Sequence, residues 1–241
     1  YMVEYGLYDF EANENKMESS FTTYFANYSS PFMFTAWEDS FYNTGTLIHE
    51  LGHYTNYFVS PASGWSVSES LDLAEVDSQG LELLMTAYFD RLYGSDEAAE
   101  AALASRLSDA LYSVLSGCME DEFQQAVYAD PDMTLEEMNA LYYKLAQEYG
   151  FADLYGYTGC EWTMIPHTFQ TPMYYISYAT SMIASLELWD LAQTDADAAR
   201  NAYLTILQRG PYTDFRETLV AAGLADPLSA DTIADIAQVL S

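Results

Sequence analysis

The sequence predicts a mainly helical protein with a small antiparallel sheet near its N-terminus. Apolar residues recur every three or four positions over most of the chain after residue 66, as amphipathic helices require. The longest such run, from Asp96 to about Ala129, places apolar side chains at every fourth position: Leu103, Leu107, Leu111, Leu115 and Met119. An aromatic run from Ser30 to Trp37, bounded by Pro31 and Asp39, has the character of a strand.

Length and composition set the class of protein. The 241 residues are enough for one large domain or a tight pair, and we expect one domain over residues 1–241. Their hydrophobic content of 50% supports a substantial core. The formal net charge of −30, from 37 acidic and 7 basic residues, argues against nucleic acid or an anionic membrane as a partner. The acidic residues are spread over many expected helices rather than gathered in one tail.

The sequence offers little information about cellular location or disulfide bonds. No run of about 18 apolar residues occurs, so no membrane-spanning helix is expected. No signal-peptide pattern opens the chain, which favours a cytoplasmic location, but the chain starts at Tyr1 within a pattern, so secretion stays open. Cys118 and Cys160 form neither a disulfide framework nor a metal motif, and we expect two buried structural thiols.

The stretch from Leu47 to His53 carries the chemistry, because it ends in His-Glu-Leu-Gly-His. On a helix, His49 and His53 lie four apart on one face, where their imidazoles can bind one tetrahedral zinc ion. Glu50 then lies beside the metal and can accept a proton from water. The alternative is a helix with two structural histidines. The chain has only 3 histidines, and two of them in this pattern favour the zinc interpretation.

The surrounding residues favour a helix here. Leu47, Ile48, Leu51, Tyr54 and Phe58 have apolar spacing of three and four, and Asp39 or Ser40 is a suitable N-cap. Gly45 and Gly52 weaken the helix. We therefore expect another part of the protein, such as a neighbour of the metal site, to pack closely against them.

A catalytic zinc ion needs a third protein ligand and one open position. The next expected helix, from Ser66 to Leu92, offers five acidic candidates: Glu69, Asp72, Glu75, Asp77 and Glu82. Most acidic residues on such a helix face solvent. Glu75 shares the side of Leu71, Ala74 and Leu83, and Glu82 lies two turns further along the same face. Spacing alone therefore leaves the ligand unassigned.

The remaining elements follow in order. Thr134 and Glu137 form a capping-box pattern that opens a helix to about Tyr149. Glycines mark loops from Phe151 to Trp162. We expect helices over 195–207 with Thr194 as N-cap, over 214–222 and over 229–240, with a break at Gly210-Pro211. His167, the last histidine, stands beside Pro166 in an aromatic stretch, where structural loop residues are common. Tyr174 and Tyr178 share a face if this stretch is helical.

Three stretches together resemble the oligoendopeptidase F and thimet oligopeptidase group of zinc peptidases. They are His49-Glu50-Leu51-Gly52-His53; Asp72-Leu73-Ala74-Glu75-Val76-Asp77-Ser78; and the pattern of His167, Phe169, Pro172, Tyr174, Tyr175, Ile176 and Tyr178. The resemblance extends over essentially all of residues 1–241, loosely outside these stretches. It implies a zincin-type helical catalytic domain.

The resemblance also assigns roles to individual residues. It makes Glu75 the third ligand of one zinc ion per chain, with His49 and His53. It makes His167 and a following tyrosine hydrogen-bond donors to the oxyanion; we select Tyr174 and Tyr178, with Tyr175 as an alternative. It places Phe32, Met33 and Phe34 in a strand that lines the cleft, where an extended peptide can pair with a sheet edge.

The expected reaction is hydrolysis of internal bonds in short peptides. The zinc ion makes water more acidic, Glu50 accepts the water's proton, and Glu50 passes the proton to the leaving amine. In the family, the segment that matches the start of this chain follows a long helical region, so we expect a C-terminal catalytic half without its N-terminal half. Two other interpretations stay open: a non-catalytic peptide-binding fragment, and the C-terminal half of a split peptidase.

Overall fold

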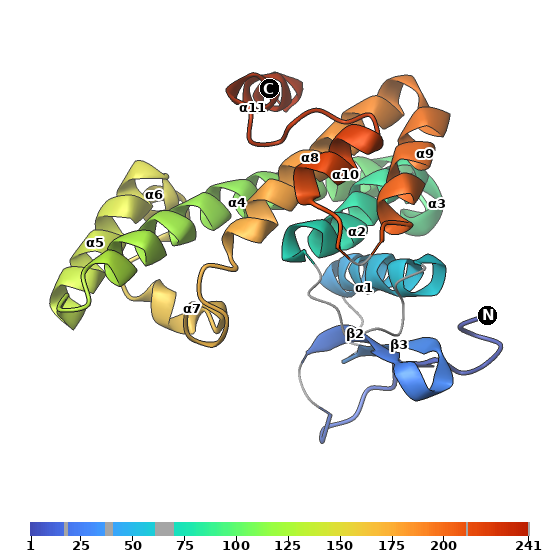
Figure 1. Cartoon of the computed structure of the whole chain (residues 1–241), viewed down its shortest axis with the longest axis horizontal. Helices are drawn as coiled ribbons and strands as arrows, with labels where there is room; N and C mark the ends of the chain where they lie inside the picture. Colours follow the sequence, from blue (N-terminus) through green and yellow to red (C-terminus); the bar gives the residue numbers. More distant parts are fainter. Residues whose placement is uncertain (17–18, 37–40, 61–69, 211, 241) are drawn as a thin grey trace. The chain divides into compact units, whose positions relative to one another are not determined.

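The computed structural model describes residues 1–16, 19–36, 41–60, 70–210 and 212–240. The predicted fold class is confirmed, since helices dominate and one small sheet lies near the N-terminus (Figure 1). The chain divides into two compact units: unit 1 comprises residues 1–107 and 181–241, and unit 2 comprises residues 108–180. A single catalytic domain over residues 1–241 stays a prediction.

The sheet belongs to unit 1 and has three strands in the order β1-β3-β2. The strands are β1 (Tyr8–Asp9), β2 (Ser20–Phe25) and β3 (Ser30–Thr35). β2 and β3 are antiparallel, with Phe21 opposite Phe34 and Ser20 opposite Thr35. β1 is parallel to β3, with Tyr8 opposite Met33. The small sheet is therefore confirmed, but one of its two pairings is parallel.

The expectation that β3 forms a sheet edge is wrong. β3 is the central strand, flanked by β1 and β2. The irregular aromatic segment at the start of the chain supplies both neighbours, and the Met33 amide donates to the Leu7 carbonyl at 3.2 Å. A two-residue strand such as β1 is too short for a period of two to reveal it in the sequence.

Unit 1 is built on α1 and α2, which lie against each other, with α1 also packed against β2 and β3 (Figure 1). Its core joins α2 to the later helices through Leu73, Val76, Leu188, Tyr203 and Ile206. The elements of unit 1, with α4 and α8 shared with unit 2, are η1 (Ala26–Tyr28), α1 (Phe41–Val59), α2 (Leu71–Leu84), η2 (Met85–Tyr88), α3 (Phe89–Tyr93), α4 (Asp96–Ala129), α8 (Ile176–Thr194), α9 (Ala196–Leu207), α10 (Phe215–Ala221) and α11 (Ala230–Val239).

Unit 2 packs the later part of α4 against a helical hairpin. Its core is aromatic and includes Met119, Phe123, Tyr142, Phe151 and Trp162. The other elements of unit 2 are α5 (Leu135–Glu148), α6 (Phe151–Tyr155), η3 (Glu161–Met164) and α7 (His167–Gln170). The predicted capping box at the start of α5 is confirmed in both directions between Thr134 and Glu137.

Three helix assignments differ from the sequence expectation. α8 was not predicted, because the sequence from 177 to 186 is buried almost throughout except at Tyr178 and has no charged residue that would mark a solvent-facing side. The helix expected over 66–92 begins within the described residues at Leu71 and gives way to a 3₁₀ turn at Met85. α6 lies inside the expected loop. Residues 66–69, and the proposed N-caps Asp39 and Ser40, lie outside the described residues.

Smaller corrections concern a cap and a thiol. Asp195 rather than Thr194 caps α9, since its carboxylate accepts the Ala198 amide at 2.9 Å. Cys160 is exposed and Cys118 is half-buried, so the expected pair of buried thiols is wrong.

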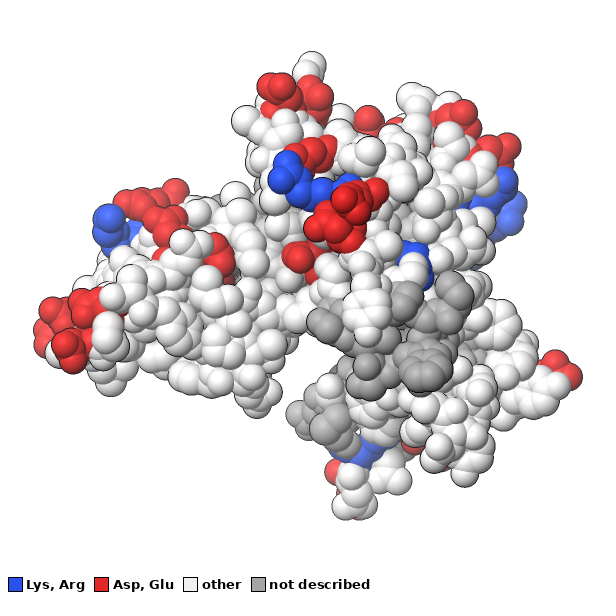
Figure 2. All heavy atoms as spheres, in the orientation of Figure 1, with Lys and Arg blue, Asp and Glu red and all other residues white. Residues whose placement is uncertain are grey.

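The surface charge follows the composition. Figure 2 shows acidic groups scattered over the face drawn there, with few basic groups among them. No helix among the described residues has the length and apolar character needed to cross a membrane.

Candidate metal and catalytic site

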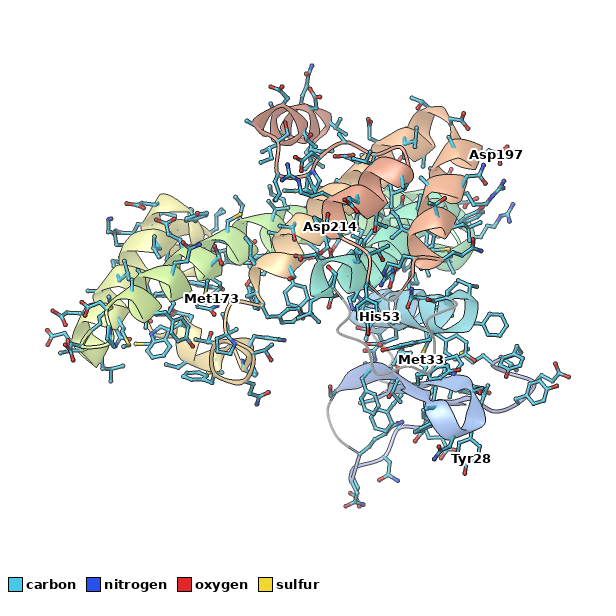
Figure 3. The ribbon with its side chains drawn as sticks, viewed as in Figure 1. Tyr28, Met33, His53, Met173, Asp197 and Asp214 are labelled. Atoms are coloured by element: carbon cyan, nitrogen blue, oxygen red, sulfur yellow. The ribbon has the colours of Figure 1, made fainter. Side chains whose placement is uncertain are left out.

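α1 supplies three of the expected site residues. His49 and His53 are one helical turn apart, and their ring centroids are separated by 5.0 Å. His53 is labelled in Figure 3 on α1, in unit 1. Both rings are half-buried, whereas Glu50, between them in sequence, is 6% exposed. The helix therefore holds two imidazoles and a buried carboxylate in one small region.

α2 brings Glu75 to the two histidines. Glu75 Oε2 lies 3.6 Å from His49 Nε2 and 4.0 Å from His53 Nε2. One potential ligand atom from each of these residues falls within 4.8 Å of the others. In a tetrahedral zinc site with bonds near 2.1 Å, ligand atoms are about 3.4 Å apart. The donor set and its spacing therefore fit a small divalent cation such as zinc.

The other acidic candidates on α2 have different surroundings. Asp77 is buried and accepts two hydrogen bonds from Arg209, at 2.6 and 2.9 Å. Glu82 meets the far side of the His49 ring, with its Oε1 2.6 Å from Nδ1. Asp72 is half-buried in the first turn of α2, and Glu69 lies outside the described residues. Among the described candidates, Glu75 alone joins both histidines.

The buried carboxylates of Glu50 and Glu75 each accept a hydrogen bond from a hydroxyl group. Ser78 Oγ donates to Glu75 Oε2 at 3.1 Å from the next turn of α2. Thr22 Oγ1 on β2 lies 2.9 Å from both the Glu50 carbonyl oxygen and Glu50 Oε2. Sequence reasoning missed Thr22, because an ordinary strand residue 28 positions from Glu50 carries no local signal.

The environment shifts the pKa of several site groups. Burial acts to lower the pKa of His49, but the hydrogen bond and charge of Glu82, with other nearby carboxylates, raise it to about 9. Burial and the charge of His49 lower the pKa of His53 to about 4. Burial raises the pKa of Glu50, although His49 and Thr22 oppose this shift. Such clustered shifts are typical of functional sites.

Close packing of other helices against α1, α2 at Gly52 and α4 at Gly45, confirms the expectation for both glycines. A Cβ atom at Gly52 would lie 2.2 Å from the Asp77 carbonyl oxygen and 2.6 Å from the Ser78 Cα atom. A Cβ atom at Gly45 would lie 2.6 Å from Nη2 of Arg106. Gly52 therefore lets the backbone of α2 approach α1 beside the two histidines.

We expect Gly52→Ala to destabilise the protein by about 3 kcal/mol, because the added methyl group meets backbone atoms that cannot rotate away. It should also weaken divalent-cation binding, since α1 and α2 must separate. Urea unfolding and metal titration measure the two effects. Gly210→Ala is the control, because a Cβ there meets no atom within 4 Å among the described residues other than its chain neighbours. Equal stability of the two variants would contradict the close-packing argument.

β3, the strand expected to line the substrate cleft, has one buried face. Met33 is fully buried, so its side chain contributes to the packing of the protein. Phe32 and Phe34 are half-buried and alternate with it. Phe34 stacks on Phe21 at 4.9 Å, and the Lys16 ammonium group lies 4.4 Å from its ring. Substrate contact along Phe32, Met33 and Phe34 stays a prediction.

The second expected group of residues lies in unit 2. The His167 ring is 5.3 Å from the Tyr174 ring, 5.6 Å from Tyr175 and 5.7 Å from Tyr178. The Tyr178 hydroxyl lies 3.4 Å from His167 Nε2. His167, Tyr175 and Tyr178 also line a cavity of about 300 Å³. Unit 2 therefore brings the histidine and all three tyrosines into one cluster.

A glutamine on α4 holds the turn that carries these tyrosines. Met173 has φ = 65°, which is rare for a residue other than glycine. Its amide donates to Gln124 Oε1 at 2.8 Å. Sequence reasoning missed Gln124, which lies 49 positions from Met173 on another helix.

The fold and the site together define a class of protein. A helix that carries His-Glu-x-x-His, packed against a helix that offers a buried glutamate, is typical of zinc-dependent peptidases. A sequence model of peptidase family M3 matches residues 1–238, and the chain belongs to this family. The resemblance drawn from the three sequence stretches is thereby confirmed.

Relatives and solved structures agree with this assignment. Group B oligopeptidase PepB of Streptococcus agalactiae serotype III (strain NEM316) is 28% identical over 216 residues, covering 84% of this chain and 35% of PepB. Oligopeptidase PepF of Bacillus subtilis (strain 168) is 26% identical over 191 residues, covering 76% of this chain and 28% of PepF. PZ peptidase A, solved with an inhibitor, superposes with a TM-score of 0.88 at 27% identity, over 100% of this chain and 44% of that one. The chain thus spans about a third of the length of these two relatives.

Proposed function

We propose that this chain carries the catalytic centre of a zinc-dependent oligoendopeptidase that hydrolyses internal bonds of short peptides. The observation that carries the proposal is the cluster of His49, His53 and Glu75, with the buried Glu50 adjoining it on α1. The relatives' names, oligopeptidase PepB and PepF, support peptides as the substrate class.

Two imidazole nitrogens and one carboxylate oxygen would hold the zinc ion and leave a position open for other ligands. When bound, zinc supplies Lewis-acid polarisation of the scissile carbonyl and makes water more acidic. Carboxylate and neutral imidazole are both suited to this ion. The Ser78 hydroxyl on Glu75 Oε2 would limit rotation of the carboxylate.

Glu50 is the proposed general base. Its carboxylate accepts the proton of the attacking water at one of its oxygens and later gives that proton to the leaving amine. The Thr22 hydroxyl fixes Oε2 by a hydrogen bond and therefore restricts the direction in which the carboxylate faces. Burial of Glu50 limits competing solvation of this group.

His167 and a tyrosine are the proposed donors to the oxyanion of the tetrahedral intermediate. Support comes from their clustering in unit 2 and from the short separation of the Tyr178 hydroxyl and His167. Donors directed at developing charge lower the barrier more than contacts that are equal in substrate and transition state. Tyr174 and Tyr178 are our first choices.

Glu75→Ala tests the metal assignment directly. We expect it to lower zinc occupancy sharply, because two imidazoles alone leave the ion without its anionic ligand. Elemental analysis after dialysis against a weak chelator, with far-UV circular dichroism to check folding, measures the effect.

The control is Asp72→Ala, which removes a carboxylate from the same helix but outside the cluster. Full zinc retention by Glu75→Ala would contradict the ligand assignment. Zinc binding by the unsubstituted protein without cleavage of any test peptide would contradict activity of this chain by itself and favour either a peptide-binding role or the C-terminal half of a split peptidase.

A further inference from the structure

One carboxylate on α2, that of Glu82, connects the candidate metal ligand His49 to an arginine on α4. Glu82 is 7% exposed, and both of its oxygens have partners. Oε1 lies 2.6 Å from His49 Nδ1, and Oε2 accepts from Nη1 of Arg106 on α4. The side chain of Arg106 is itself largely buried, with 16% of it exposed. The three groups thus form a continuous chain of charge-assisted hydrogen bonds within unit 1.

The position of Glu82 determines which nitrogen of His49 can bind a metal ion. A carboxylate can only accept, so His49 Nδ1 must carry the hydrogen that the two groups share. In the neutral imidazole, the form that binds a metal ion, Nε2 then keeps its lone pair, and Nε2 is the nitrogen 3.6 Å from Glu75 Oε2. Glu82 itself approaches the ring from the side away from Glu75. It therefore orients a ligand rather than acting as one.

Arg106 in turn fixes Glu82. A buried carboxylate that meets only one imidazole could rotate, but the guanidinium group holds its second oxygen. Gly45 on α1 leaves the space for this guanidinium, since a Cβ there would lie 2.6 Å from Nη2. The atom that a Cβ would meet is the end of a flexible side chain. A methyl group at position 45 would therefore displace Arg106 without touching Glu82 or His49.

We propose that Glu82 and Arg106 are positioning residues that hold His49 in the tautomer and orientation required for metal binding through Nε2. The proposal rests on the metal site proposed above and adds two residues to it. In this proposal, Arg106 acts on the metal site through Glu82, and Glu82 acts through His49. Loss of either residue should therefore lower metal affinity while leaving the three ligands in place.

The test is zinc affinity measured by competition with a chelating indicator in the full chain. We expect Glu82→Ala to weaken binding by about 10–100-fold, the usual range for a lost carboxylate partner of a histidine ligand. Arg106→Leu should weaken it by less, because Glu82 remains. The double variant should bind no more weakly than Glu82→Ala alone, since residues that act in series are not additive. Arg200→Leu, which removes an exposed arginine from a surface ion pair, is the control.

A second readout reports on the ring itself. The chain has only 3 histidines, so long-range ¹H–¹⁵N spectra of the imidazoles can be assigned by single substitutions. In the zinc-loaded protein, we expect His49 to show the Nδ1–H tautomer and Glu82→Ala to reduce its population. Glu82→Gln is the conservative variant if Glu82→Ala does not fold, and Gly45→Ala should reproduce the effect of Arg106→Leu.

The outcomes separate this inference from the proposed function. If the unsubstituted chain binds no zinc, the metal site itself is wrong. If it binds zinc and the Glu82 and Arg106 variants bind equally well with an unchanged His49 tautomer, only the positioning roles are wrong. Additive losses in the double variant would contradict action in series.

Discussion

Replacement of Glu50 by glutamine is expected to leave zinc binding intact and to lower kcat by about 10²–10⁴-fold, the usual contribution of a general base. Glutamine has nearly the same shape, and its amide oxygen can still accept the hydrogen bond from Thr22. It cannot accept the water's proton at pH 7. Peptide cleavage followed by chromatography, in a form of the protein that cleaves the unsubstituted test peptide, gives kcat, and elemental analysis gives the zinc content.

A graded series makes this result specific. Thr22→Val removes the hydroxyl that orients Glu50 but keeps the base, so its kcat should fall less than that of Glu50→Gln. Glu136→Gln, at an exposed position in the first turn of α5, controls for the loss of one carboxylate. Full activity of Glu50→Gln would exclude Glu50 as the base. Loss of zinc from this variant would instead assign Glu50 to metal binding.

His167→Ala is expected to keep its zinc and to lower kcat by about 10²–10³-fold, as removal of one oxyanion donor does in other hydrolases. KM should change little, because the lost hydrogen bond forms mainly in the transition state. Steady-state kinetics on one fluorogenic peptide separates the two constants, and zinc analysis of the same sample tests for a ligand role.

Replacing each tyrosine by phenylalanine in turn identifies which one donates a hydrogen bond to the oxyanion. Tyr174→Phe, Tyr175→Phe and Tyr178→Phe each keep the ring contacts with His167 and delete only one donor. We expect kcat to fall in the Tyr174→Phe or the Tyr178→Phe variant. If His167→Ala loses zinc, His167 is a ligand and the assignment of Glu75 is wrong. If it keeps full activity, His167 is a structural loop residue.

The sequence by itself determined the features that depend on residues close together in the chain. His49, Glu50 and His53 share one helical turn, so their spacing alone brought them together on α1. The capping box at Thr134 and Glu137 is equally local and was predicted completely. The close approach at Gly52 was also anticipated, because glycine in a helix has a cost that only packing or function explains.

The tertiary structure decided what depends on neighbours from other elements. Spacing left five acidic ligand candidates, with Glu75 and Glu82 on one helical face, and only the packing of α2 on α1 gave these two different partners. Thr22 reaches Glu50 from a strand, and Arg106 reaches Glu82 from α4. Single contacts of this kind leave no periodic trace in the sequence.

α8 and the central position of β3 are two features of the fold that the local sequence likewise did not predict. The first half of α8 is buried on nearly all sides and has no charged side facing solvent. The order of strands depends on their pairing partners rather than on each strand's own residues. The local sequence therefore determined the elements and the catalytic motif. Long-range packing decided which side chains meet at the site, because each such contact depends on how separate helices and strands come together.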